Sequence, residues 1–125
     1  MSVFQRQEDD GVARGARALV VLPDFGKGGL RSADARLEEA VGLAAAIGLD
    51  VRDTAILRIR AAKPATLFGS GQVDSIRASV NAYEVDVVIV DGTLTAVQQN
   101  NLEKSLDTKV IDRTGLILEI FGERA

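Results

Sequence analysis

Hydrophobic positions along the chain come in strand-like runs separated by segments with helical spacing. The apolar run at 18–22, which Pro23 ends, predicts a strand buried on both faces of a parallel sheet. Residues 54–60 alternate apolar and more polar positions, so we expect a strand with one wetter face, at or near a sheet edge. The runs at 85–90 and 109–111 predict two more strands.

The first two helices are predicted from start signals and spacing. Ser32 is placed to cap a helix that Gly48 would end, because a hydroxyl accepts from free backbone N–H groups and glycine readily closes a helix. The Gly69–Gly71 turn leads into a second helix. Its spacing places four side chains on one side: Val73, Ile76, Val80 and Tyr83.

The last two helices follow the third and fourth strands. Thr95 and Gln98 form a capping box, in which each side chain accepts from the other residue's backbone N–H, so a helix should run to about Leu106. Thr114 is placed as the N-cap of a final helix. The apolar face of that helix requires a partner and is made of Leu116, Ile117, Ile120 and Phe121.

Strands and helices alternate four times, so the connections between parallel strands should be right-handed crossovers. We expect an α/β fold: an open, mostly parallel four-stranded sheet with helices on both faces, ending in a truncated linker helix. The predicted strand order is 2-1-3-4. It places a topological switch point between the first and third strands, where such sheets usually bind ligands, flanked by loops 24–29 and 91–93.

Three segments are expected along the chain. Residues 1–15 mix charge, glycine and isolated apolar positions without a period, which predicts a mobile N-terminal tail. Residues 16–113 form the predicted α/β domain. Residues 114–125 are interpreted as the start of a helical linker toward a domain that is absent from this chain.

Composition limits the chemistry. With 125 residues and 46% hydrophobic content, the chain is long enough for one compact domain. It has no Cys and no His, which removes thiolate nucleophiles, imidazole bases, disulfides and the usual zinc ligands. No apolar run is long enough to span a bilayer and the polar, acidic start does not suit a signal peptide, so we expect a cytoplasmic protein with no membrane partner.

Charge favours a local rather than a global anion-binding surface. The formal net charge of -3 argues against a surface committed as a whole to nucleic acid, and we expect no DNA partner. A local basic face remains open at Arg58, Arg60 and Lys63. Phe25 and Lys27, in a glycine-rich loop, are further contact candidates, since an exposed ring can stack on a base or enter a protein pocket. An ordinary solvated surface is the alternative for each set.

Two more polar groups have two interpretations each. Gln98 and Asn101 belong to a run of uncharged amides that suits RNA or a peptide backbone, or simply a solvated helix face. Asp91 and Asp112 each follow a strand and could together hold a magnesium ion. Aspartate after a strand also commonly caps a turn, and a local ion pair of Asp112 with Arg113 is the favoured alternative.

The turn of Gly69, Ser70 and Gly71 is the candidate phosphate site. Glycines let backbone N–H groups approach a phosphate, and a helix N-terminus adds positive potential. The spacing is neither that of a P-loop nor a complete Gly-x-Gly-x-x-Gly, because Asp74 stands three positions after Gly71. A tight entry turn into the helix is the structural alternative.

Four motifs follow one another along the chain: Ala65-Thr66-Leu67-Phe68-Gly69-Ser70-Gly71, Asp91-Gly92-Thr93-Leu94-Thr95 with Gln98, Asn101-Leu102-Glu103, and Val110-Ile111-Asp112-Arg113-Thr114. In this order they resemble the N-terminal domain of the HflX family of ribosome-associated GTPases, over residues 16–125. One departure is Gln72, included among the phosphate-binding candidates. It stands where the family commonly has a lysine, so the cation best suited to a phosphate is missing.

The resemblance implies a non-catalytic effector domain that contacts the large ribosomal subunit, both rRNA and protein, and couples a GTPase cycle to splitting or rescuing ribosomes under stress. The family's GTPase domain lies further downstream and would be an intramolecular partner. GTP and Mg2+ would then belong to the full-length protein, and no cofactor is expected in this chain, which has no P-loop and no Asn-Lys-x-Asp stretch.

Two other functions stay open. The chain could act as an autonomous nucleotide-binding domain, holding ATP at the 69–71 turn and the Asp91 edge. It could also be a self-association module that uses the apolar stripe of the last helix.

Overall fold

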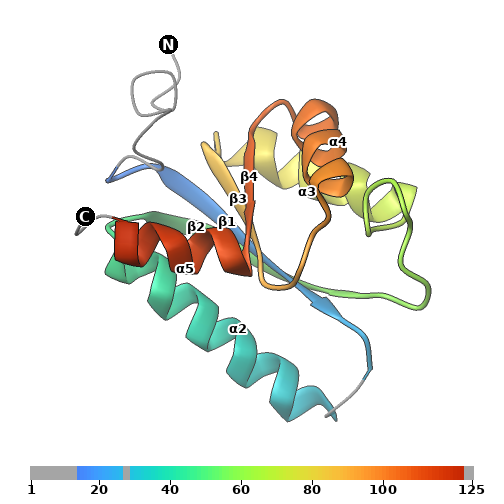
Figure 1. Ribbon diagram of the computed structural model, residues 1–125, viewed down its shortest axis with the longest axis horizontal. Coiled ribbons are helices and arrows are strands. Elements are labelled where there is room, and N and C mark those ends of the chain that lie inside the picture. Colours follow the sequence, from blue (N-terminus) through green and yellow to red (C-terminus); the bar gives the residue numbers. More distant parts are fainter. Residues whose placement is uncertain (1–13, 27–28, 123–125) are drawn as a thin grey trace.

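The strands form one parallel sheet. The computed structural model describes residues 14–26 and 29–122. Its four-stranded sheet has the order β2-β1-β3-β4, with every neighbouring pair parallel (Figure 1). The strands are β1 (Arg17–Asp24), β2 (Asp50–Arg58), β3 (Val87–Val90) and β4 (Lys109–Asp112). The predicted α/β class and strand order are confirmed.

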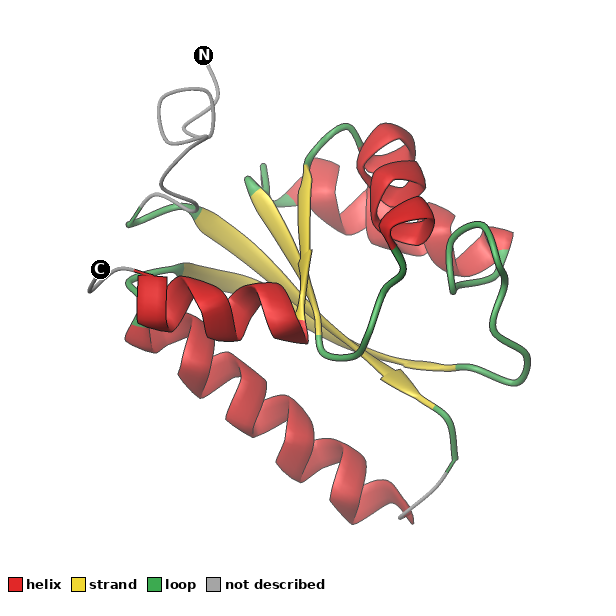
Figure 2. Ribbon diagram, viewed as in Figure 1, coloured by secondary structure: helices red, strands yellow, loops and turns green. Residues whose placement is uncertain are grey.

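Helices cover both faces of the sheet. They are α2 (Gly29–Ala46), α3 (Ser70–Ala82), α4 (Ala96–Leu106) and α5 (Arg113–Gly122). Helices α2 and α5 lie on one face and α3 and α4 on the other (Figure 2). Right-handed crossovers place α2 on one face and α3 and α4 on the other, because the chain moves one way along the sheet from β1 to β2 and the other way afterwards. In the described part of the chain, no helix is both long and apolar enough to cross a bilayer.

Two hydrophobic cores lie on opposite faces of the sheet. Leu19, Val21, Val88 and Val90 face α3 and α4, whereas Val20 and Ile89 face α2 and α5. The two central strands, β1 and β3, are therefore buried on both faces, as their unbroken apolar runs predict. Strand β2 lies at an edge, and its residues alternate between exposed and half-buried.

Several predicted boundaries are wrong by a few residues. Strand β2 begins at Asp50, because Asp50 N–H donates to Ala16 O at 2.9 Å and extends the pairing with β1. Helix α2 begins at Gly29, so Ser32 lies inside its first turn and not at its N-cap. Tyr83 is 43% exposed, since it is the C-cap of α3 and lies beyond the buried stripe. Gly48, with φ +87°, does end α2 in the left-handed conformation.

Helix α5 is part of the same packed unit. Leu116 is 1% exposed, and Ile120 packs against the core beneath α2. Leu116 and Ile120 of the predicted apolar face thus find a partner within this chain, whereas the placement of Phe121 on that face is wrong, because its side chain is 61% exposed. Packing continues past residue 113, where the linker was expected to begin. Leu118 and Phe121 remain exposed on the opposite side. The predicted tail at 1–15 lies, apart from Arg14 and Gly15, outside the described residues.

The position of α5 gives a stability prediction. Leu116→Ala should lower the free energy of unfolding by about 2–5 kcal/mol, because it removes a fully buried side chain and leaves a cavity. Leu118→Ala on the same helix should change it by less than about 0.5 kcal/mol, since that side chain is 63% exposed. Urea unfolding of both variants tests this, and equal effects would mean that α5 does not pack as described.

Candidate functional site

The carboxyl ends of β1 and β2 bring two candidate contact residues together. Ile59 N–H donates to Asp24 O at 2.8 Å, which joins the loop after β1 to the loop after β2. Gly26 has φ +83°, and a β-carbon there would come 2.6 Å from Nη2 of Arg58, so the guanidinium lies directly against this glycine. Phe25 is 46% exposed beside it. Lys27 lies outside the described residues.

Residues 59–69, called here the clamped loop, extend from β2 on the side of the molecule away from α5 (green, right of Figure 1). Lys63 N–H donates to Leu67 O at 3.1 Å and Leu67 N–H to Lys63 O at 2.8 Å, which closes a small antiparallel bridge. All residues from 60 to 65 are exposed. The loop therefore presents Arg60 and Lys63 to solvent, and Arg58 is exposed where it begins.

Two side-chain amides hold this loop by its backbone carbonyls, and a third binds the end of β2 directly before it. Gln98 Nε2 donates to Lys63 O at 2.9 Å, and Asn101 Nδ2 donates to Ala65 O at 2.9 Å. Gln72 Nε2 donates to Arg58 O at 2.7 Å. The loop thus keeps its shape without using its own cationic side chains.

The geometry favours a positioning role for Gln98 and Asn101, while direct contact with RNA stays a prediction. Gln98 is 7% exposed, and its Oε1 accepts from Thr95 N–H at 2.9 Å while Thr95 Oγ1 accepts from Gln98 N–H at 3.0 Å. This confirms the predicted capping box. A buried amide that uses both ends internally has little capacity left for an external partner.

Backbone strain marks the end of the clamped loop. Leu67 has φ 72°, an unfavourable conformation for a bulky residue that typically costs about 1–3 kcal/mol. Leu67 and Phe68 are 5% and 1% exposed, so burial of both side chains and the bridge to Lys63 offset that strain. No sequence pattern predicted this conformation.

The Gly69–Gly71 turn begins α3 as predicted. Gly69 is the N-cap, and Gln72 Oε1 accepts from Gly69 N–H at 3.1 Å. Because the other end of the Gln72 amide donates to Arg58 O, Gln72 binds the turn to β2 and is not free for a phosphate. Ser70 and Gly71 are exposed, and phosphate binding at this turn stays a prediction.

Arg113, the first residue of α5, connects the end of β3 with helix α2. Its Nη1 lies 2.6 Å from Asp91 Oδ1, its Nη2 lies 3.0 Å from Glu39 Oε1, and its N–H donates to Gly92 O at 3.1 Å. The hydrogen bond to Asp91, and then that to Glu39, raises the pKa of Arg113 above its ordinary value. The guanidinium thus stays charged at any working pH. The expected ion pair of Arg113 with Asp112 is wrong, because Asp91 and Glu39 are its partners.

Both carboxylates proposed for magnesium have structural roles. Asp112 Oδ1 accepts from Gly115 N–H at 2.9 Å and Oδ2 from Leu94 N–H at 3.1 Å. Asp112 and not Thr114 therefore caps α5. Asp91 is 2% exposed and pairs through Oδ1, while its Oδ2 is buried without a partner among the described residues. Within those residues, no three His, Cys, Asp or Glu side chains are grouped to hold a metal.

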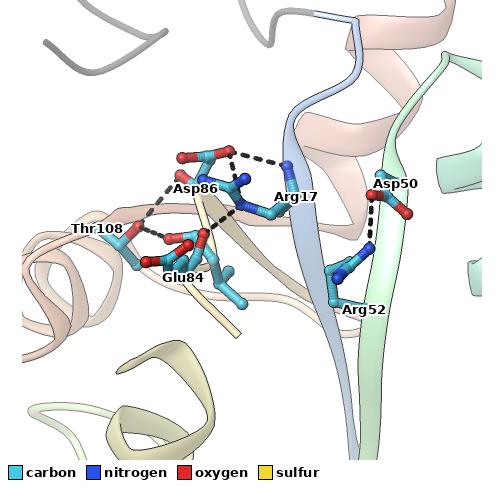
Figure 3. A network of polar contacts seen from close by, with 7 residues as sticks. Arg17, Asp50, Arg52, Glu84, Asp86 and Thr108 are labelled. Atoms are coloured by element: carbon cyan, nitrogen blue, oxygen red, sulfur yellow. Dashed lines mark hydrogen bonds and ion pairs between the residues drawn. The ribbon is translucent and has the colours of Figure 1, made fainter. Parts of the chain in front are cut away.

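A second polar network lies at the opposite, amino edge of the sheet (Figure 3). Arg17 N–H donates to Asp86 Oδ2 at 2.9 Å and Arg17 Nε to Glu84 O at 2.8 Å. Thr108 Oγ1 lies 3.1 Å from Asp86 O. An open cavity of about 400 Å³ adjoins it, lined partly by Arg17, Glu84, Asp86 and Asp107. These bonds tie β1 to the segments before β3 and β4, which is a structural role that periodicity did not reveal.

Comparison with known proteins identifies the chain. Residues 34–122 match the family described as GTP-binding GTPase N-terminal. The chain belongs to this family. It is 52% identical over 89 residues to the GTPase HflX of Magnetococcus marinus, which covers 71% of this chain and 21% of that protein. The GTPase HflX of Escherichia coli is 36% identical over 89 residues, again 71% of this chain and 21% of the relative. The resemblance to HflX is confirmed, and the chain spans about a fifth of these relatives.

Solved structures share the fold of this family member. A GTP-binding protein from the hyperthermophilic archaeon Sulfolobus solfataricus, in complex with GDP, superimposes with a TM-score of 0.58 and 20% identity over 83% of this chain and 30% of its own. A complex of SsGBP and GDP gives a TM-score of 0.61 at 19% identity, over 87% of this chain and 30% of its own. At such identities the likeness concerns the α/β fold.

The cap of α5 can be tested with a matched pair. Asp112→Ala should lower the free energy of unfolding by about 1–2 kcal/mol, because it removes the N-cap of α5 and an acceptor for Leu94 N–H. Thr114→Ala should leave it within about 0.5 kcal/mol, since Thr114 is exposed. Thermal or urea unfolding measures both, and a larger loss for the Thr114 variant would restore Thr114 as the cap.

Proposed function

We propose that this chain is the N-terminal effector domain of an HflX-like GTP-binding protein, where it contacts the large ribosomal subunit and couples GTPase state to splitting or rescue of ribosomes in the cytoplasm. The family match over residues 34–122 and the HflX relatives support the assignment. GTP and Mg2+ would bind to a GTPase domain of the longer protein, since the sequence of this chain has no P-loop and no Asn-Lys-x-Asp stretch.

The observation that carries the proposal is the exposed, cationic run next to Phe25. The ribosomal subunit is a large polyanion, and a domain with a net charge of -3 needs a local basic surface to approach it. Arg58, Arg60 and Lys63 provide such a surface at the carboxyl edge of the sheet.

Co-sedimentation with purified large ribosomal subunits tests this function directly. We expect the chain to pellet with the subunits at low salt and to be released as salt increases, because attachment through phosphates weakens steeply with ionic strength. The small subunit, sedimented in parallel, is the control for non-specific attachment. Absence of the chain from the large-subunit pellet at the lowest salt would refute a ribosome-binding role for this chain.

Nucleotide binding by the chain itself makes a separate prediction. If GTP and ATP bind elsewhere in the longer protein, neither should raise the melting temperature of this chain. Binding at a hundred times Kd would stabilise the folded state by about 2.7 kcal/mol and would be plain in a thermal scan. A rise that Gly71→Val abolishes would instead favour the autonomous nucleotide-binding domain.

A further inference from the structure

We propose that the clamped loop docks on the phosphate backbone of ribosomal RNA, with Arg60 and Lys63 as the contacting cations and Arg58 and Phe25 at the border of the surface. The inference deepens the proposed function and rests on it. It names the element of the domain that makes the contact and the chemical group that it contacts.

The charged side chains of the segment around the clamped loop are all positive. The sequence has no Asp or Glu from Arg58 to Val73. In the described part of the chain, Arg17, Arg52, Arg77 and Arg113 each form an ion pair with a carboxylate. No such pair engages the cations at 58–63 within that same part. A cation without an internal partner can bind a phosphate without first losing a hydrogen bond. Three such cations lie within six residues here with no acid among them, so this surface is well prepared for an anion.

Side chains of α4 hold the clamped loop by its backbone. Gln98 and Asn101 bind the backbone carbonyls of residues 63 and 65, and these bonds leave the exposed side chains of Arg60 and Lys63 unused. The left-handed Leu67 shows that the loop keeps this shape at an energetic cost. A loop with a preset shape loses less conformational entropy when it binds, which favours docking on a rigid surface such as folded RNA.

Few groups on this surface could recognise individual bases of the RNA. The clamped loop carries one aromatic residue, Phe68, which is 1% exposed and cannot stack on a base. Phe25, on the adjoining loop after β1, is 46% exposed and could do so. The polar groups that could read base edges, Gln98 and Asn101, donate to backbone carbonyls within the domain. Recognition should therefore follow the position of phosphates and the shape of the RNA, with little dependence on sequence.

The test is binding of the chain to protein-free large-subunit rRNA, measured by filter retention over a salt series. The loop variant combines Arg60→Gln with Lys63→Gln. A matched control combines Lys104→Gln with Lys109→Gln, which removes the same charge from α4 and β4, at lysines that pair with no carboxylate within residues 14–26 and 29–122. The loop variant should reduce the slope of log K against log salt by roughly 1.5 to 2, and the control should leave it unchanged.

A third variant separates position from charge. Asn101→Leu is uncharged and similar in size but has no donor for Ala65 O, so it should loosen the clamped loop while leaving the charge of the domain unchanged. We expect severalfold weaker RNA binding with the wild-type salt slope. Circular dichroism and urea unfolding show whether each variant remains folded, and only folded variants are compared.

Each outcome decides the inference. A wild-type slope in the loop variant, or an equal loss of slope in the control, would overturn it. If the chain pellets with large subunits but does not bind protein-free rRNA, the contact runs through ribosomal protein, and the inference fails while the proposed function stands. If the chain pellets with no subunit, both fail together.

Discussion

The pairing of β1 with strands on both sides is the constraint on which the rest of the structure depends. Ala18 to Val21 bond to β2 on one side and to β3 on the other, and these residues are at most 1% exposed. Burial of both faces sends α2 and α5 to one side and α3 and α4 to the other. It also aligns the ends of β1 and β2, which places Gly26, the neighbour of the exposed Phe25, against the Arg58 guanidinium. The candidate surface is thus a direct result of sheet register.

Helix α4 connects the far edge of the sheet to the clamped loop. Toward β4, Glu103 Oε2 accepts from Val110 N–H at 3.0 Å and Gln99 Nε2 donates to Val110 O at 2.7 Å, which satisfies an edge strand with side chains and protects it from pairing with another chain. Toward β2, Gln98 and Asn101 bind the loop. Three of the four amides at 98–101, Gln98, Gln99 and Asn101, thus have internal bonds, and Glu103 has another.

Local patterns predicted what depends on neighbours in sequence, and missed what depends on distant residues. The buried strands, the Thr95 capping box and the strand order follow from hydrophobic runs, short-range side-chain bonds and crossover handedness. Asp112 as the cap of α5 also holds Leu94 N–H, and Arg113 reaches Glu39 across 74 positions, contacts that no local pattern contains. Gln72 at the third position of α3 is a capping signal, which a comparison with the family's lysine at this position does not reveal. The exposed cations were predicted because basic residues lie close together in this stretch of the sequence.

Hydrogen–deuterium exchange on the chain, free and with saturating large ribosomal subunits, tests the central claim most directly. The account predicts that bound subunits slow exchange in peptides covering the clamped loop, residues 59–69, and leave peptides of α2 and α5 unchanged. Protection confined to α2 or α5, with the clamped loop exchanging as in the free chain, would contradict it.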